Sequence, residues 1–158
     1  MRLATVILVF SVLAAVRVDS AEVAIVVNRS NPISEQALKE LVAIFEQRQQ
    51  FWKTGERIHL ILQESARPEK QIILRKVYRK GDEELKKYWL MKVFKGEIAG
   101  VPTTLSSNEA VKRFVRQVPN AIGFVDATTV DETVKVLRIE GLLPGDPGYP
   151  LSDRLDDT

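Results

Sequence analysis

Blocks of apolar and polar residues along the chain predict an ordered series of strands and helices. The run Glu22–Asn28 is β-branched and almost continuously apolar, which is typical of a strand buried on both faces of a sheet. A helical apolar repeat follows, formed by Leu38, Leu41, Val42 and Phe45. With Ser34 as its N-cap, this helix is expected to run to about Gln47. A second apolar run, Ile58–Gln63, predicts the next strand.

Two more helices are predicted in the middle of the chain. One begins near Pro68, a residue favoured in the first turn, and runs to about Arg79. The next begins at Asp82 as N-cap, and its apolar side is marked by Leu85, Trp89 and Phe94. Residues 97–105 read as a loop containing Gly and Pro. Ser106 and Glu109 then form a Ser-x-x-Glu capping box that starts the fourth helix.

The fourth helix leads into a turn and a core strand. Its apolar face is formed by Val111, Phe114, Val115 and Val118. Pro119 ends the helix and Asn120 suits the turn. We expect Phe114 to be buried, together with Ile122 and Phe124 in the strand 121–125. Gly123 within that strand predicts the close approach of another element. Val134–Ile139 is expected to be the last strand.

The N-terminal residues have the pattern of an export signal. Met1 and Arg2 give a short basic start, and Leu3–Val16 is apolar but short for a membrane span. We expect cleavage after Ser20, which leaves Ala21 as the mature N-terminus; the alternative is an uncleaved N-terminal anchor. The chain has no Cys, which excludes disulfides, thiolate metal sites and a lipoprotein anchor. A periplasmic protein, secreted by a cleaved signal peptide, is therefore expected.

Composition and charge limit the function classes. Residues 1–20 are expected to be signal peptide, 21–142 one α/β domain and 143–158 an irregular C-terminal arm. The 23 Lys and Arg nearly balance the 21 Asp and Glu, so a nucleic-acid partner is not expected. His59 is the only histidine, and no pair of nucleophile and base stands out. We therefore expect neither an enzyme nor a metal or other cofactor.

Several short segments resemble one protein family. The segment PNAIGF, from Pro119, resembles the "PGAIGY" segment of bacterial periplasmic phosphate ABC transporter substrate-binding proteins. Phe45, Trp52 and Gly55 match the family's "IF-G" and "W-x-x-G" segments, and Tyr88–Gly96 resembles its "YW…F-G" stretch. The resemblance implies one lobe of a type II periplasmic-binding-protein fold: a mixed sheet of about four strands flanked by helices. A full binding protein of this family has two lobes, and this chain is long enough for one.

The loop 63–70 is the candidate ligand site. It joins the end of a strand to the start of a helix, where free N–H groups and the helix dipole favour anions. The family's phosphate-binding members carry Ser-Gly-Thr followed by Arg here, and alignment puts Arg67, Pro68, Glu69 and Lys70 opposite these residues. Pro68 lacks an N–H donor and Glu69 adds a negative charge. Ser65, Arg67 and Lys70 are the expected ligands of a small inorganic anion, in a site that differs from the family's.

Two function classes remain open at this stage. The first is a periplasmic binding-protein-like domain for a phosphate-like anion, associated with ABC-type phosphate transport. The alternative is an interaction or sensor module of the cell envelope that keeps the fold but has lost the phosphate site. Its partner would be an envelope protein or a second copy of the chain. Donors that converge at residues 65–70 would favour the first class, and solvent-exposed Glu69 and Lys70 the second.

Overall fold

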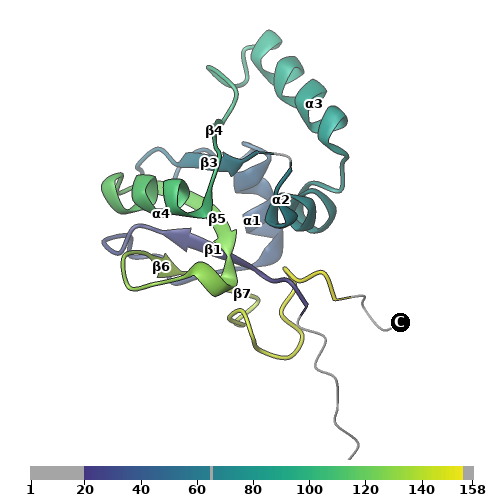
Figure 1. The fold of residues 1–158 in the computed structure, drawn as a ribbon. Coiled ribbons are helices and arrows are strands. Elements are labelled where there is room, and N and C mark those ends of the chain that lie inside the picture. The colour runs from purple at the N-terminus through teal and green to yellow at the C-terminus, as the bar shows by residue number, and fades with distance from the viewer. Residues whose placement is uncertain (1–19, 65, 155–158) are drawn as a thin grey trace, which may run out of the picture.

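A computed structural model of the chain describes residues 20–64 and 66–154. The proposed signal peptide lies almost entirely outside the described residues, and so does Ser65. Figure 1 shows a central mixed sheet with helices on both faces. The strands are β1 (Val23–Val27), β2 (Glu35–Gln36), β3 (His59–Gln63), β4 (Thr103–Leu105), β5 (Ala121–Asp126), β6 (Lys135–Val136) and β7 (Arg138–Ile139).

The main sheet has five strands in the order β4-β3-β5-β1-β6. β3 pairs in parallel with both β4 and β5, whereas β1 is antiparallel to β5 and β6. In the β1–β5 register, Ile25 lies opposite Phe124 and Val26 opposite Gly123. All five residues of β1 are buried, as its continuous apolar run predicts. β2 and β7 form a separate two-stranded parallel sheet.

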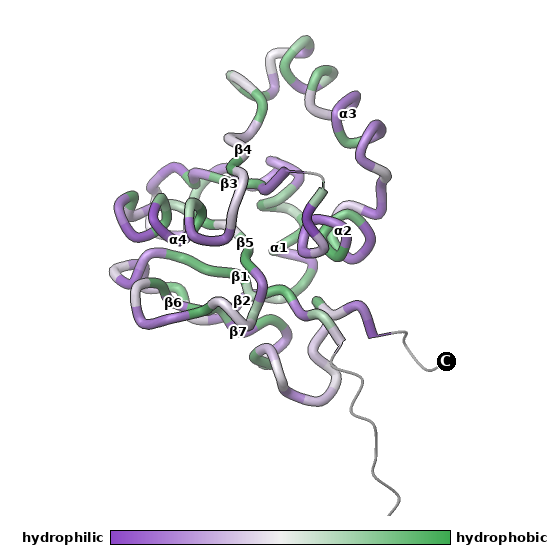
Figure 2. Tube along the Cα trace, in the orientation of Figure 1, coloured by the Kyte–Doolittle hydropathy of each residue, from purple (hydrophilic) through white to green (hydrophobic). Residues whose placement is uncertain are grey.

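The described residues form four α-helices: α1 (Leu38–Phe45), α2 (Pro68–Ile73), α3 (Asp82–Phe94) and α4 (Asn108–Gln117). α2 continues directly into a π-helix, η1 (Leu74–Tyr78), and a short 3₁₀ helix, η2 (Ala127–Thr129), follows β5. Alternate residues of the strands point to opposite faces of the sheet and form two hydrophobic cores, one on each face. α4 packs over one face, against residues such as Val26, and α1, α2 and α3 contribute to the core on the other face, which includes Ile25. Figure 2 shows apolar positions along the central strands and polar ones on the outer turns.

The mixed α/β class expected from the sequence is confirmed, but several boundaries were wrong. Ser34 is not the N-cap of α1: the next two residues pair with β7 as β2, and the helix begins only after Ala37. Gly81, not Asp82, precedes α3 as its N-cap. Ser107, not Ser106, caps α4, because its Oγ accepts the Ala110 N–H at 3.1 Å. The expected loop 97–105 ends in β4, which pairs with β3.

Two burial predictions and one strand boundary also need correction. Phe94 was expected on the apolar side of α3, yet it is 88% exposed. Phe114 is only partly buried, although Ile122 and Phe124 are fully buried as predicted. The expected last strand is interrupted at Leu137, so that β6 joins the main sheet and β7 pairs with β2.

The C-terminal residues are irregular, as expected, but they are packed against the start of the sheet. The Tyr149 hydroxyl donates to the Val23 carbonyl at 2.7 Å, and the Val23 N–H donates to the Leu151 carbonyl at 2.9 Å. Leu151 is fully buried. Within the described part of the chain, no helix has both the length and the apolar character needed to cross a membrane.

Candidate functional site

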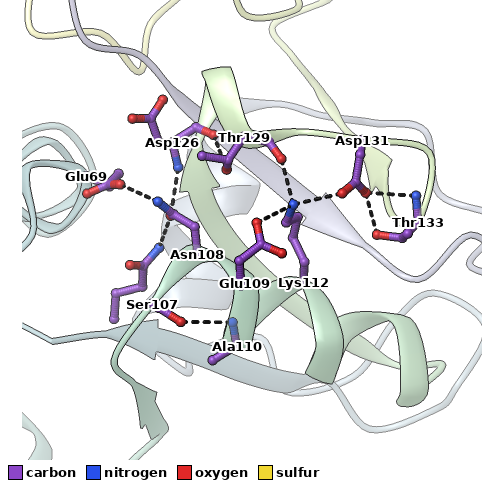
Figure 3. Close-up of polar contacts among 11 residues, drawn as sticks. Glu69, Ser107, Asn108, Glu109, Ala110, Lys112, Asp126, Thr129, Asp131 and Thr133 are labelled. Carbon is purple, nitrogen blue, oxygen red and sulfur yellow. Dashed lines mark hydrogen bonds and ion pairs between the residues drawn. The ribbon is translucent and has the colours of Figure 1, made fainter.

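The candidate site lies where two parallel strands end and two helices begin. Gln63 is the last residue of β3, and Asp126 is the last residue of β5. Asn108 is the first residue of α4, and Glu69 is the second residue of α2. Figure 3 shows Glu69, Asn108 and Asp126 close together at this edge. The edge is the place where an α/β fold offers helix N-termini to an anion.

Asn108 is the centre of the polar network at this edge. Its Nδ2 donates to Glu69 Oε1 at 2.8 Å. Its Oδ1 accepts from Gln63 Nε2 at 2.8 Å and from the Asp126 backbone N–H at 3.0 Å. Gln63 Nε2 also donates to the Phe124 carbonyl at 2.8 Å. Asn108 is buried, so these bonds hold the two strand ends and the two helix starts in fixed positions.

The Glu69 carboxylate is at the position where the sequence predicts a bound anion. It is buried with 5% of its surface exposed. Besides the Asn108 amide, it receives a long contact from the Arg67 guanidinium, whose NH2 lies 3.4 Å from Oε1. Arg67 thus pairs with an acidic side chain of its own loop. Among the described residues, Glu69 Oε2 and Arg67 Nε are buried without a hydrogen-bond partner, so the pair is not fully satisfied.

Lys70 is directed elsewhere. It is buried, and its Nζ donates to the Gln63 backbone carbonyl at 3.1 Å. Burial lowers the pKa of Lys70, an effect that the nearby Asp82 carboxylate opposes. Arg67 and Lys70 therefore donate to different partners and do not converge on one ligand position. Neither expected arrangement is present: the donors do not converge, and Glu69 and Lys70 are not exposed to solvent.

Lys70 also lines a cleft of about 420 Å³ between α3 and the β3–β4 edge of the sheet. Most of its wall is apolar, from Leu62, Leu85, Trp89, Leu90, Val101 and Pro102. The polar lining residues are Gln63, Glu64, Lys70, Asp82, Lys86 and Thr104. This combination suits a ligand or a partner side chain that is largely apolar.

A second polar cluster holds the connection after β5 against α4. Lys112 is buried, and its Nζ contacts Asp131 Oδ2 at 2.8 Å, Glu109 Oε1 at 2.7 Å and the Thr129 carbonyl at 2.8 Å. The bond to Asp131 raises the pKa of Lys112, and the same bond holds the pKa of Asp131 well below its usual range. Three acceptors occupy the ammonium group, so this cluster is structural (Figure 3).

The sequence analysis did not identify Asn108 as a site residue, because it assigned the helix start to a capping box of Ser106 and Glu109. The only available signal was its position at the start of a predicted helix, because the strand before it, β4, has no apolar pattern in the sequence. His59 is exposed at the start of β3. Among residues 20–64 and 66–154, no group of three acidic, His or Cys side chains could hold a metal ion.

Comparison with solved structures defines the class of fold. The chain superposes on an ABC-type phosphate transport receptor from Vibrio cholerae with a TM-score of 0.63 and 18% identity, covering 78% of this chain and 48% of that one. A putative phosphate ABC transporter substrate-binding protein from Clostridium perfringens, solved with bound phosphate, gives a TM-score of 0.63 at 19% identity. The match covers 78% of this chain and 47% of that one. PstS from Borrelia burgdorferi gives a TM-score of 0.66 at 16% identity, and the match covers 84% of this chain and 55% of that one.

The chain thus has the fold of phosphate ABC transporter substrate-binding proteins and spans about half the length of these solved chains. The resemblance noted in the sequence is confirmed at the level of the fold, in a short, single-lobe form. No protein-family model matches the sequence, and no curated protein sequence matches it.

Proposed function

We propose that the protein is a substrate-binding-protein-like domain of the cell envelope whose anion position is held by its own Glu69 carboxylate. On this proposal it serves as an interaction or sensor module and does not capture phosphate as a monomer. One observation carries the proposal: Glu69 Oε1 accepts from Asn108 Nδ2 at 2.8 Å at the start of α2. An internal carboxylate there gives the helix N-terminus and the Asn108 amide the negative partner that a free anion would otherwise supply.

Three physical effects act against phosphate in this loop. Phosphate would have to displace Glu69 or lie beside it, and two like charges in one buried site repel each other. Pro68 at the first position of α2 lacks an N–H donor. A single lobe leaves the ligand in contact with water, where each charged contact contributes less than in a closed cleft. We therefore expect the monomer to bind phosphate with a Kd no tighter than roughly 0.1–1 mM.

A second candidate is binding of a small inorganic anion at the same loop, in association with ABC-type phosphate transport. The unsatisfied atoms of the loop favour it: Arg67 Nε and Glu69 Oε2 are buried without partners among the described residues. An anion that displaced the Glu69 side chain could bind the Arg67 guanidinium instead. Lys70, the next residue after Glu69, would be the second basic ligand. Ser65, which lies outside the described residues, would complete the set of ligands expected from the sequence.

Titration calorimetry with phosphate on residues 21–158 separates the two candidates. The proposal predicts no binding tighter than about 0.1 mM for the unmodified monomer. Glu69→Thr should strengthen binding, because it frees the Asn108 amide and removes the repelling charge. Glu64→Thr is the matched control: Glu64 is an exposed acid of the same loop, so the same charge is removed while Glu69 stays in place.

If the phosphate affinity gained by Glu69→Thr depends on Arg67, phosphate binds at this loop. The affinity gained by Glu69→Thr should fall when Arg67 is also replaced by Gln, and it should fall with added salt. Micromolar binding of phosphate by the unmodified monomer would overturn the proposal and support the second candidate. Equal gains from Glu69→Thr and Glu64→Thr would also contradict it, because loss of net charge would then explain the effect.

A location outside the cytoplasm and a non-enzymatic role belong to the same proposal. The signal-like residues 1–20 support export. The solved structures of the same fold are described as phosphate transport receptors and phosphate-binding proteins, which supports a binding role. An envelope protein or a second copy of the chain is the expected partner.

A further inference from the structure

Helix α3 exposes a group of large apolar side chains that are not part of the core. Figure 1 shows α3 standing apart from the body of the molecule, and Figure 2 shows apolar positions at its outer end. Exposed apolar residues of α3 and of the loop that follows it form what we call the α3 patch: Leu90, Met91, Val93, Phe94 and Val101. Phe94 is 88% exposed, more than any other large apolar side chain of the described residues.

Two side chains on the other side of α3 attach the helix to the core. Leu85 and Trp89 lie on the opposite side of α3 and are buried in the core, where the Trp89 ring meets the Tyr78 ring edge-on at 6.0 Å. α3 therefore has apolar side chains on two sides, although one apolar side is enough to attach a surface helix. Several large apolar side chains exposed on one short segment are typical of an interaction surface.

The charges of α3 favour a second copy of the same helix as the partner. Its first turn carries Asp82, Glu83 and Glu84, of which Asp82 and Glu83 pair with Lys86 of the same helix, and its end carries the exposed Lys95. Two α3 helices packed antiparallel bring the acidic start of each helix to the basic end of the other. Their dipoles then oppose each other favourably as well. A two-fold axis makes such a contact self-complementary, because every pairing occurs twice.

The cleft beside the patch provides a place for the most exposed side chain. It has a volume of about 420 Å³, its walls are mostly apolar, and Leu90 and Val101 belong to both the cleft and the patch. Phe94 lies outside the cleft of its own chain. A projecting aromatic ring next to an apolar cleft that it does not fill is the arrangement expected for reciprocal insertion between two copies.

We propose that the α3 patch binds a second copy of this chain, with the two α3 helices antiparallel and Phe94 of each copy entering the other's cleft. In this dimer the entry to the cleft lined by Lys70 is covered by the partner. The pair would have about the mass of one of the solved chains, of which a single copy of this chain spans about half. This inference is independent of the role proposed for Glu69.

Sedimentation velocity of residues 21–158, over about 1–200 µM, tests the proposal. The unmodified protein should form a concentration-dependent dimer, and Phe94→Glu should weaken dimerisation at least about tenfold. Gln117→Glu is the matched control, because it adds the same charge at an exposed residue of α4, which packs on the other core of the sheet and outside the cleft lining. Charge reversal by Glu84→Lys should weaken the dimer, and Glu84→Lys with Lys95→Glu should restore it.

Each remaining outcome overturns the proposal. A protein that stays monomeric over the whole range has no such dimer, and a dimer that survives Phe94→Glu uses another surface. Monomers that bind vesicles of phosphatidylglycerol, and lose this binding on Phe94→Glu, would assign the patch to a lipid surface instead. Circular dichroism should show that Phe94→Glu and the milder Phe94→Ser remain folded, since the side chain is exposed.

Discussion

Gly123 of β5 and Val111 of α4 approach so closely that a Cβ on Gly123 would lie 2.9 Å from Val111 Cγ1. Ile61 Cβ, on the neighbouring strand β3, would lie 3.5 Å from this added Cβ of residue 123. Both neighbours are buried, so neither can move into solvent. The absence of a side chain at Gly123 therefore lets α4 pack directly on the sheet, and this fixes the start of α4 next to the polar site.

Replacement of Gly123 by Ala should lower the free energy of unfolding by about 1–3 kcal/mol, because the added methyl group overpacks the core. Gly123→Val should cost more. Val111→Ala in the Gly123→Ala background should recover part of the loss by making room for the methyl group. Urea unfolding measures these changes. Gly100→Ala is the control, since nothing lies within 4 Å of its Cβ position, and an equal loss there would contradict the packing argument.

The strands that were predicted correctly have a local signal. β1, β3 and β5 are apolar runs bounded by turn residues, and each can be identified without knowing its partner. β4 could not be found in this way, because Thr103–Leu105 has no apolar pattern and becomes a strand only by pairing with β3. β2 likewise depends on β7, about a hundred residues later in the chain. Local sequence carries little information on pairings of this kind.

The loop proposed as the candidate site does join a strand to a helix, as the sequence predicts, but its contacts could not be predicted. The change from strand to helix at residues 63–70 identified the place. The role of Glu69 depends on Asn108, which is 39 residues away in sequence. Two adjacent serines precede Asn108, and both are plausible caps. The structure uses Ser107, which makes Asn108 the first residue of α4, with Glu69, Gln63 and Asp126 in reach.

Acid should weaken the attachment of α4 to the segment after β5. The bond from Lys112 holds the pKa of Asp131 below its ordinary value of 3.8, so the stabilisation is complete above about pH 5 and is lost as the pH falls further. Asp131→Asn should lower the melting temperature at neutral pH, and its difference from the unmodified protein should shrink between about pH 5 and pH 2. Glu132→Gln, at an exposed neighbouring acid, should not show this convergence. A constant difference across the range would contradict the prediction.

The mature chain should begin near Ala21. N-terminal sequencing of the protein from a periplasmic fraction checks this expectation, which comes from the apolar stretch and the residues around Ser20. A mature N-terminus at Ala21 would also leave the described part of the chain almost unchanged, since β1 begins at Val23. Recovery of intact Met1 in the membrane fraction would instead support the uncleaved anchor.

Exchange of donor and acceptor between residues 108 and 69 tests the network at the candidate site. Asn108→Asp is nearly isosteric, and its carboxylate can still accept from Gln63 Nε2 and the Asp126 N–H. It can no longer donate to Glu69, and it places a second buried negative charge beside the first. The variant should lose about 3 kcal/mol of unfolding free energy at neutral pH, and less in acid, where one carboxyl group takes up a proton.

Adding Glu69→Gln should restore most of the loss, because the new amide donates to the carboxylate introduced at position 108. Glu69→Gln alone should cost less than Asn108→Asp. Additive losses in the double variant, measured by urea unfolding, would show that the two side chains do not depend on each other and would remove the basis for treating Glu69 as the internal occupant of the anion position.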